Sequence, residues 1–103
     1  MAFYLVTMTH SNLSGWTRHV QSHIAFLRQI LEEGSLRASG PLVEAPVKAG
    51  LLIIKADTRL AAEAIIARDP FSREGLIDEL TIQEWNPLFG VFATESSGGI
   101  PSI

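Results

Sequence analysis

The hydrophobic and polar positions along the chain follow two periods, one of two residues and one near four. Short runs of aromatic and β-branched residues predict strands, and apolar residues three and four apart predict helices. The predicted elements are a strand at 2–8, a helix from about 15 to 33, a short strand beginning at 35, a strand at 51–56, a helix at 57–69 and a strand at 76–85. This βαββαβ order predicts an α+β, ferredoxin-like fold with an antiparallel sheet and both helices on one face.

Residues that favour helix ends fix the predicted boundaries. We expect Ser14 to cap the first helix and Gly34 to end it, because glycine adopts the left-handed conformation at low cost. Asp57 or Thr58 is expected to cap the second helix. In the first helix, the apolar stripe expected to face the sheet consists of Val20, Ile24, Leu27 and Leu31.

Two predicted strands are apolar on both faces. The runs "FYLV" and "LLII" do not alternate as half-exposed antiparallel strands do, and two helices cover only one side of a sheet. We therefore predict a homodimer in which a second copy packs its sheet face to face with the first. The alternative is that "LFGVF" at 88–92 folds back as a lid, and the two arrangements are compatible.

Composition narrows the class of protein. The 103 residues form one predicted domain at 1–92, followed by a Ser/Gly-rich tail at 93–103 that is expected to be flexible. A net charge of -3 without a basic cluster argues against a nucleic-acid partner. The chain has no cysteine, no basic and apolar leader and no apolar run long enough for a membrane helix. We expect a cytoplasmic protein.

The histidines are the first candidates for chemistry. His19 and His23 lie four residues apart, a spacing that can hold a metal, but no third ligand is evident nearby and no metal site is predicted. His23 lies beside Ile24 and Leu27, on the edge of the stripe that faces the sheet. It is interpreted either as a core histidine bonded to a backbone carbonyl or as a general acid/base, since free imidazole titrates near neutral pH.

The carboxylate of Asp69 is a second candidate. It is expected at the carboxyl end of a helix, which carries partial negative charge and favours a cation instead. The dipeptide Asp69-Pro70 explains a turn, in which the aspartate accepts backbone N–H groups. Its charge still needs support among apolar neighbours such as Phe71, and a protonated His23 would give that support.

The turn "ASGP" supplies candidate binding groups. Ser39 offers a hydroxyl, and Gly40 offers a backbone that a ligand can approach closely. No nucleophile motif or acid–base relay accompanies Ser39, so a nucleophilic role is not predicted. Arg37, beside this turn, is a candidate anion contact.

The ordered segments of the chain resemble the YCII-related (YciI-like) family. The resemblance rests on "HIAFLRQILEEGSLRASGPL", "GLLIIKADTRLAAEAIIARDPFSREGL" and "IDELTIQEWNP", and it extends to Pro87. It implies a dimeric α+β barrel with a pocket where His23 meets Asp69, lined also by Ser39 and Gly40. Substrate-binding roles are expected for Ser39, Gly40, Arg37 and Phe71.

The resemblance also implies a class of activity. The family includes a dehydrochlorinase that acts on a chlorinated hydroxyquinol, and some members resemble muconolactone isomerases in architecture. The expected function is thus a lyase or isomerase that needs no cofactor and moves protons on a small aromatic or lactone compound. The alternative is a non-catalytic dimeric protein that binds a small molecule or assists another protein. This chain departs from many relatives in its short loop at 43–49, in Val20 and in its extended tail.

Overall fold

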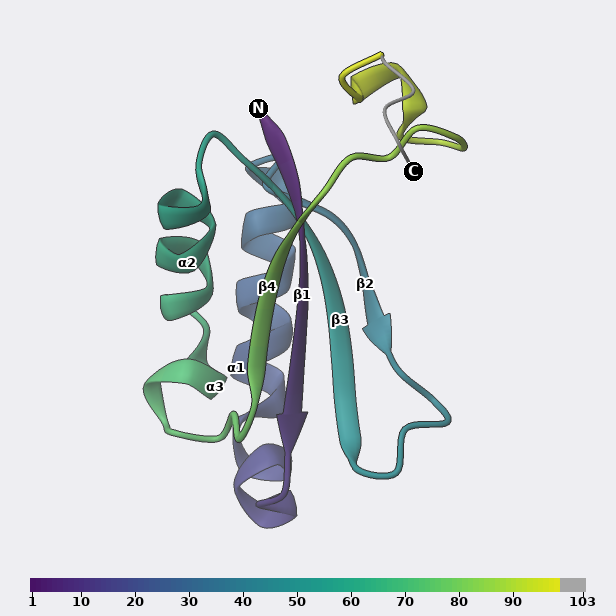
Figure 1. The fold of residues 1–103 in the computed structure, drawn as a ribbon. Coiled ribbons are helices and arrows are strands. Elements are labelled where there is room, and N and C mark those ends of the chain that lie inside the picture. The colour runs from purple at the N-terminus through teal and green to yellow at the C-terminus, as the bar shows by residue number, and fades with distance from the viewer. Residues whose placement is uncertain (99–103) are drawn as a thin grey trace.

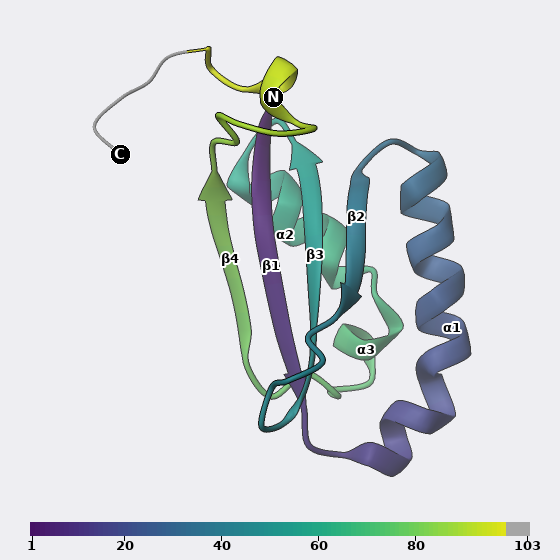
Figure 2. The ribbon, with the colours of Figure 1, turned by 90° about the vertical axis from the view of Figure 1, so that its right-hand side faces the viewer.

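The computed structural model describes residues 1–98 as an α+β fold with a four-stranded antiparallel sheet. The strands lie in the order β2-β3-β1-β4, and α1 and α2 lie on one face of the sheet (Figures 1 and 2). The elements are β1 (Ala2–His10), α1 (Leu13–Glu32), β2 (Leu36–Pro41), β3 (Lys48–Ala56), α2 (Arg59–Ala67), α3 (Pro70–Arg73), β4 (Leu80–Trp85) and a 3-10 helix, η1 (Ala93–Glu95). The predicted ferredoxin-like arrangement is confirmed. Over residues 1–98, no helix combines the length and apolar character that crossing a membrane requires.

The core fills the space between the two helices and the sheet. Alternate residues of β1 and β3, such as Val6 and Ile54, point toward the helices and are inaccessible to solvent. Ile30 of α1 and Ile66 of α2 pack against them. The two central strands, β1 and β3, pair along nine residues.

The structure corrects two sequence-based expectations for α1. Asn12, not Ser14, is its cap: the Asn12 Oδ1 accepts the Gly15 N–H at 3.0 Å, and the Ser14 hydroxyl donates to the same oxygen. The helix starts at Leu13, so Ser14 already lies inside its first turn. The other two caps follow the prediction, because Gly34 has a φ of +88° just beyond the helix and Thr58 accepts the Ala61 N–H.

The buried side of α1 is also rotated relative to the prediction. Phe26 and Ile30 are the large side chains buried in the core, whereas Leu31 is 56% exposed. Val20, Ile24 and Leu27 are only partly buried. The reason is that these three residues line a cavity rather than packed core, as described below.

An extra residue in β2 sets the direction of its side chains. Leu36 pairs with Ile54, but the next pair is Ala38 with Ile53, so the register shifts between them. In an unbroken strand, side chains three positions apart face opposite ways. Because of the bulge, Ser39 pairs with Leu52 and faces the helices, as Leu36 does.

The connection between α2 and β4 differs from the prediction in two ways. The turn at 69–75 includes the short helix α3, and the last strand begins at Leu80 rather than 76. The segment before it turns at Gly75, where φ is +67°, and buries Leu76. This turn brings the Leu76 backbone beneath the end of β1, where its carbonyl accepts a hydrogen bond from His10.

The opposite face of the sheet is covered at one end only. Phe92 lies on Phe3 with ring centroids 5.3 Å apart, and η1 follows it close to the start of β1 (Figure 2). Glu95 forms ion pairs with Arg37 and Lys55. The hydrogen bond from Arg37, and then the one from Lys55, lower the pKa of Glu95 to about 2, and the pKa of Arg37 is raised in turn by Glu95.

The domain boundary at 92 stays a prediction. Residues 93–98 make the contacts just described, while 99–103, in the predicted tail, lie outside the described residues. Toward the middle of this face, Leu5, Leu51 and Ile53 are partly exposed.

Candidate active site

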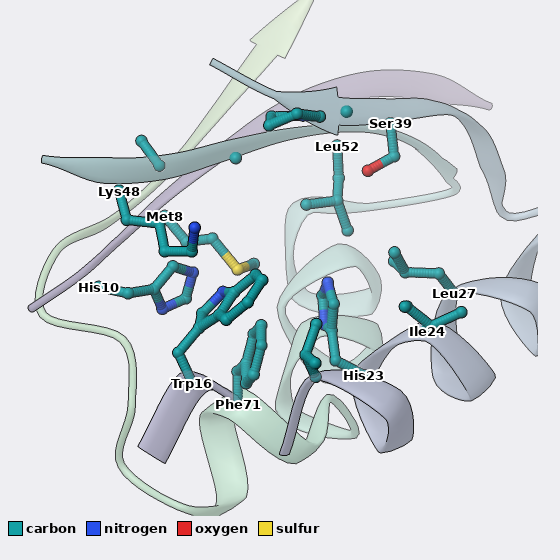
Figure 3. A pocket seen from close by; sticks show the side chains of 15 residues that line it. Met8, His10, Trp16, His23, Ile24, Leu27, Ser39, Lys48, Leu52 and Phe71 are labelled. Carbon is teal, nitrogen blue, oxygen red and sulfur yellow. The ribbon is translucent and has the colours of Figure 1, made fainter. Parts of the chain in front are cut away.

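A cavity of about 380 Å³ lies between α1 and the sheet (Figure 3). Trp16, Val20, His23, Ile24 and Leu27 form its helical side, at spacings of three and four residues that place them on one face of α1. The other side consists of residues from the strands and from α3: Met8, His10, Ser39, Gly40, Pro41, Lys48, Ala49, Gly50, Leu52 and Phe71. The lining is mostly apolar with a few polar groups, as is typical of small-molecule sites.

His23 and Asp69 meet at the back of this cavity. The Nδ1 atom of His23 lies 2.9 Å from Asp69 Oδ1 and 3.0 Å from Oδ2. The Asp69 carboxylate is completely buried, whereas the His23 side chain is 13% exposed. Because a carboxylate only accepts hydrogen bonds, Nδ1 of the neutral ring carries the proton and Nε2 keeps a free lone pair. The ring points from α1 into the cavity (Figure 3).

Asp69 owes its position to the helix that follows it. Helix α2 ends at Ala67, and Asp69 is the N-cap of α3, where its Oδ1 accepts the Phe71 N–H at 2.9 Å. A carboxylate is well suited to this position. Asp69 follows Arg68, the C-cap residue of α2, and the Phe71 N–H is the backbone donor expected of the Asp-Pro turn. The continuation of this turn as the helix α3 was not predicted.

Phe71 fixes the plane of the His23 ring. The two rings are stacked with centroids 4.2 Å apart and an interplanar angle of 15°. Phe71 is 1% exposed, and it also contacts the rings of His10 and Trp16 at 4.8 and 6.0 Å. The imidazole is thus held by one hydrogen-bonding partner at its edge and one aromatic partner on its face, which leaves little freedom for the ring to turn.

Ser39 and Gly40 lie on the strand side of the same cavity. The Ser39 hydroxyl donates to the Leu51 carbonyl at 3.0 Å, so its oxygen is left as a hydrogen-bond acceptor. Nothing lies within 4 Å of the position that a Cβ would occupy on Gly40. Ser39, Gly40 and Phe71 all line the cavity that contains His23.

Arg37 is not brought to the cavity. Its side chain extends over the other face of the sheet, where it pairs with Glu95 and lies 5.6 Å from the Phe3 ring centroid and 5.3 Å from that of Phe92. The register shift in β2 separates it from Ser39: Ser39 faces the helices, and Arg37 faces away. The expected anion contact in the cavity is therefore absent at this residue.

Three polar or aromatic residues of the lining were given no role in the sequence analysis. His10, Trp16 and Lys48 line the end of the cavity away from Ser39 (Figure 3). His10 is buried at the end of β1, and its Nδ1 donates to the Leu76 carbonyl at 2.7 Å. These residues come together because the register of β1 and β3 pairs His10 with Lys48. Hydrophobic periodicity does not predict that register.

The described part of the chain holds no group of three or more His, Cys, Asp or Glu side chains suited to a metal. The Nε2 atom of His19 instead lies 3.8 Å from the carboxylate of Glu74, at the end of α3. The chemistry available in the cavity is acid–base chemistry at an imidazole whose free nitrogen faces an apolar, partly enclosed space.

Comparisons with known proteins identify the family and the fold of the chain. The profile of the YCII-related domain matches residues 2–86. No curated protein sequence is similar enough to count as a match. Among solved structures, the chain is similar to 5-chloro-2-hydroxyhydroquinone dehydrochlorinase (TftG) from Burkholderia phenoliruptrix AC1100, in complex with 2,5-dihydroxybenzoquinone. The TM-score is 0.70 and the identity 18%, over 81% of this chain and 92% of that one. At this identity the likeness establishes the fold.

Proposed function

The chain belongs to the YCII-related family, and we propose that it is a small lyase or isomerase that works without a cofactor on a planar oxygenated compound. One observation carries the proposal: His23 is held by Asp69 through Nδ1 and presents Nε2 to a cavity of about 380 Å³. This is the arrangement of a general base with an orienting carboxylate.

The proposed reaction begins with transfer of a substrate proton to His23 Nε2. The buried Asp69 carboxylate stabilises the imidazolium that forms, since both of its oxygens face Nδ1. The electron pair left on the substrate then expels a leaving group, which is elimination. Alternatively, the imidazolium returns the proton at another carbon, which is isomerisation. Both routes restore neutral His23 once the proton has left the ring.

The shape of the cavity favours a flat substrate. Phe71 and Trp16 form an aromatic wall, and Leu52 and Met8 close the space from the sheet. The fold neighbour binds a quinone and acts on a chlorinated hydroxyquinol, according to its description. A small aromatic or lactone compound is the substrate class that we propose, with a role in the catabolism of aromatic compounds.

Turnover by matched histidine variants tests the proposal. The His23→Asn side chain retains an N–H that can donate to Asp69, but it has no counterpart of Nε2. We expect turnover of 5-chloro-2-hydroxyhydroquinone or muconolactone by the wild type, and a loss of about 10²–10⁴-fold in the variant. His19→Asn, one turn earlier on α1 and outside the cavity lining, is the control and should retain activity. Equal turnover by His23→Asn and the wild type would remove His23 from the reaction.

A non-catalytic binding or accessory role is the alternative, and one observation favours it. Asp69 caps α3 as well as bonding to His23, so the pair also holds the turn at 69–75 against α1. If this were its whole purpose, Asp69 substitutions would change stability and leave the chemistry of bound compounds untouched.

We also propose that the chain is a homodimer. The helices cover one face of the sheet, and η1 covers only one end of the other, so Leu5, Leu51 and Ile53 remain partly exposed there. A second copy of the same face would cover it about a two-fold axis. Light scattering should give twice the chain mass of 11.2 kDa, and Ile53→Glu should give the monomer mass. A monomeric wild type would overturn this proposal. The cytoplasmic location expected from the sequence stays a prediction.

A further inference from the structure

A cation and a second imidazole lie together at one end of the cavity. His10 and Lys48 are direct partners in the antiparallel pairing of β1 with β3, so their side chains leave the sheet on the same face. Both line the cavity, at the end opposite Ser39, and His23 lies between the two ends (Figure 3). A ligand that reaches His23 can therefore contact this pair as well.

The hydrogen bond of His10 fixes what its ring offers to a ligand. A backbone carbonyl only accepts hydrogen bonds, so the bond of 2.7 Å from Nδ1 to Leu76 keeps the proton of the neutral ring on Nδ1. Nε2 is then an acceptor. Among residues 1–98, every fully buried side-chain nitrogen and oxygen has a hydrogen-bond partner, and Nε2 has none from the protein. This nitrogen is therefore open to the cavity and not sealed in the core.

Lys48 supplies a charge that the protein does not neutralise at this end. Its ammonium group lies 4.0 Å from the centroid of the Trp16 ring, an aromatic contact that holds the side chain over the cavity. Within the described residues, Lys48 takes part in no ion pair, and the cavity lining contains no aspartate or glutamate. The Nζ hydrogens remain available to an anion.

We propose that His10 and Lys48 bind the part of the substrate where an oxyanion stands next to a hydroxyl. Lys48 Nζ donates to the oxyanion, and the adjacent hydroxyl donates to His10 Nε2. A neutral carbonyl without a hydroxyl would accept from Lys48 Nζ but offer nothing to His10 Nε2. An uncharged ether would engage neither residue in this way. This inference rests on the proposed function and narrows its substrate class to planar rings that carry an ionised oxygen beside a hydroxyl, such as phenolate or enolate forms of vicinal diols.

Binding of a coloured probe tests the inference without any turnover. At mildly alkaline pH, 4-nitrocatechol carries one oxyanion beside one hydroxyl, and 1,2-dimethoxy-4-nitrobenzene has the same ring without either. Lys48→Met keeps the apolar stem and removes the charge, and His10→Asn keeps a donor near the Leu76 carbonyl and removes Nε2. Lys55→Met, on the other face of β3, removes the same charge far from the cavity and is the matched control.

We expect calorimetry to show nitrocatechol binding to the wild type and to Lys55→Met with equal affinity. Lys48→Met should weaken it at least about tenfold, as loss of a charge-assisted hydrogen bond does, and Lys48→Arg should restore most of the affinity. His10→Asn should weaken nitrocatechol binding several-fold. The dimethoxy compound should bind the wild type, Lys48→Met and His10→Asn with equal affinity. Added salt should weaken nitrocatechol binding to the wild type and not to Lys48→Met.

Equal nitrocatechol affinity in Lys48→Met and the wild type would overturn the inference. An equal loss for the dimethoxy compound would also overturn it, because the lysine stem and not its charge would then be responsible. The result is separable from the proposed function. Loss of turnover in His23→Asn with unchanged binding in Lys48→Met would leave the enzyme and remove this subsite. Unchanged turnover in His23→Asn with weakened binding in Lys48→Met would leave the subsite and remove His23 from the reaction.

Discussion

Replacing Asp69 with asparagine separates the structural contribution of this residue from its chemical one. Asparagine is nearly isosteric with aspartate and is an equally good helix N-cap, so its Oδ1 can still accept the Phe71 N–H. The other atom facing His23 becomes an NH₂ group, which donates. This NH₂ group lies where Oδ2 was, 3.0 Å from Nδ1, and it favours the ring tautomer in which Nδ1 accepts and the proton lies on Nε2, which faces the cavity.

The expected loss of stability is small. The charge-assisted hydrogen bond to His23 is worth about 1.5–3 kcal/mol and its neutral replacement about 0.5–1.5 kcal/mol, so Asp69→Asn should lower the free energy of unfolding by about 1 kcal/mol. Asp69→Ala leaves the buried Phe71 N–H and the Nδ1–H of His23 without their acceptor, and it should cost about 3 kcal/mol or more.

The expected loss of activity is large, because the lone pair at Nε2 is no longer available as a base. Turnover by Asp69→Asn should fall by about 10²–10⁴-fold while urea unfolding shows a folded protein. Urea curves and turnover measured on the same preparations give both numbers. The reasoning would be refuted by full turnover in Asp69→Asn, or by a stability loss as large as that of Asp69→Ala.

Three further predictions concern the fold and the residues around the cavity. Because the pKa of Glu95 is lowered to about 2, its contribution to the free energy of unfolding should be complete above its usual pKa of 4.5 and lost as the pH falls toward 2. In urea titrations, the difference in this free energy between the wild type and Glu95→Gln should shrink over that pH range. High salt should make the difference smaller, because the ion pair is partly exposed. Gly15→Ala should cost about 1–3 kcal/mol, since its Cβ would lie 2.5 Å from Leu76 Cδ2, whereas Gly40→Ala, with open space around it, should melt close to the wild type. Phe71→Leu should keep the fold but loosen the His23 ring, which broader ring proton signals in NMR would reveal.

Much of the fold could be predicted because its elements have clear local signatures. The apolar runs in β1 and β3 and the helical spacing in α1 and α2 gave the order of elements, and that order allows few topologies. Thr58 and Gly34 are helix-end residues whose role follows from short-range chemistry, and both behave as expected.

The site was predictable only in part, because it depends on contacts distant in sequence. His23 and Asp69 are 46 residues apart, and the family resemblance, not periodicity, brought them together. The bulge in β2 decides that Ser39 faces the cavity and Arg37 faces Glu95, and no composition rule predicts a bulge at this point. His10 and Lys48 become neighbours through the register of two strands, which is a property of the whole sheet.

The state of the His23 ring tests the central claim most directly. Long-range ¹H–¹⁵N correlation spectra of the wild type and of Asp69→Asn, recorded where the imidazole is neutral, report which ring nitrogen carries the proton. We predict a protonated Nδ1 and a free Nε2 in the wild type, and the reverse in the variant. A wild-type ring with its proton on Nε2 would contradict the account, because the nitrogen that faces the cavity would then have no lone pair with which to accept a substrate proton.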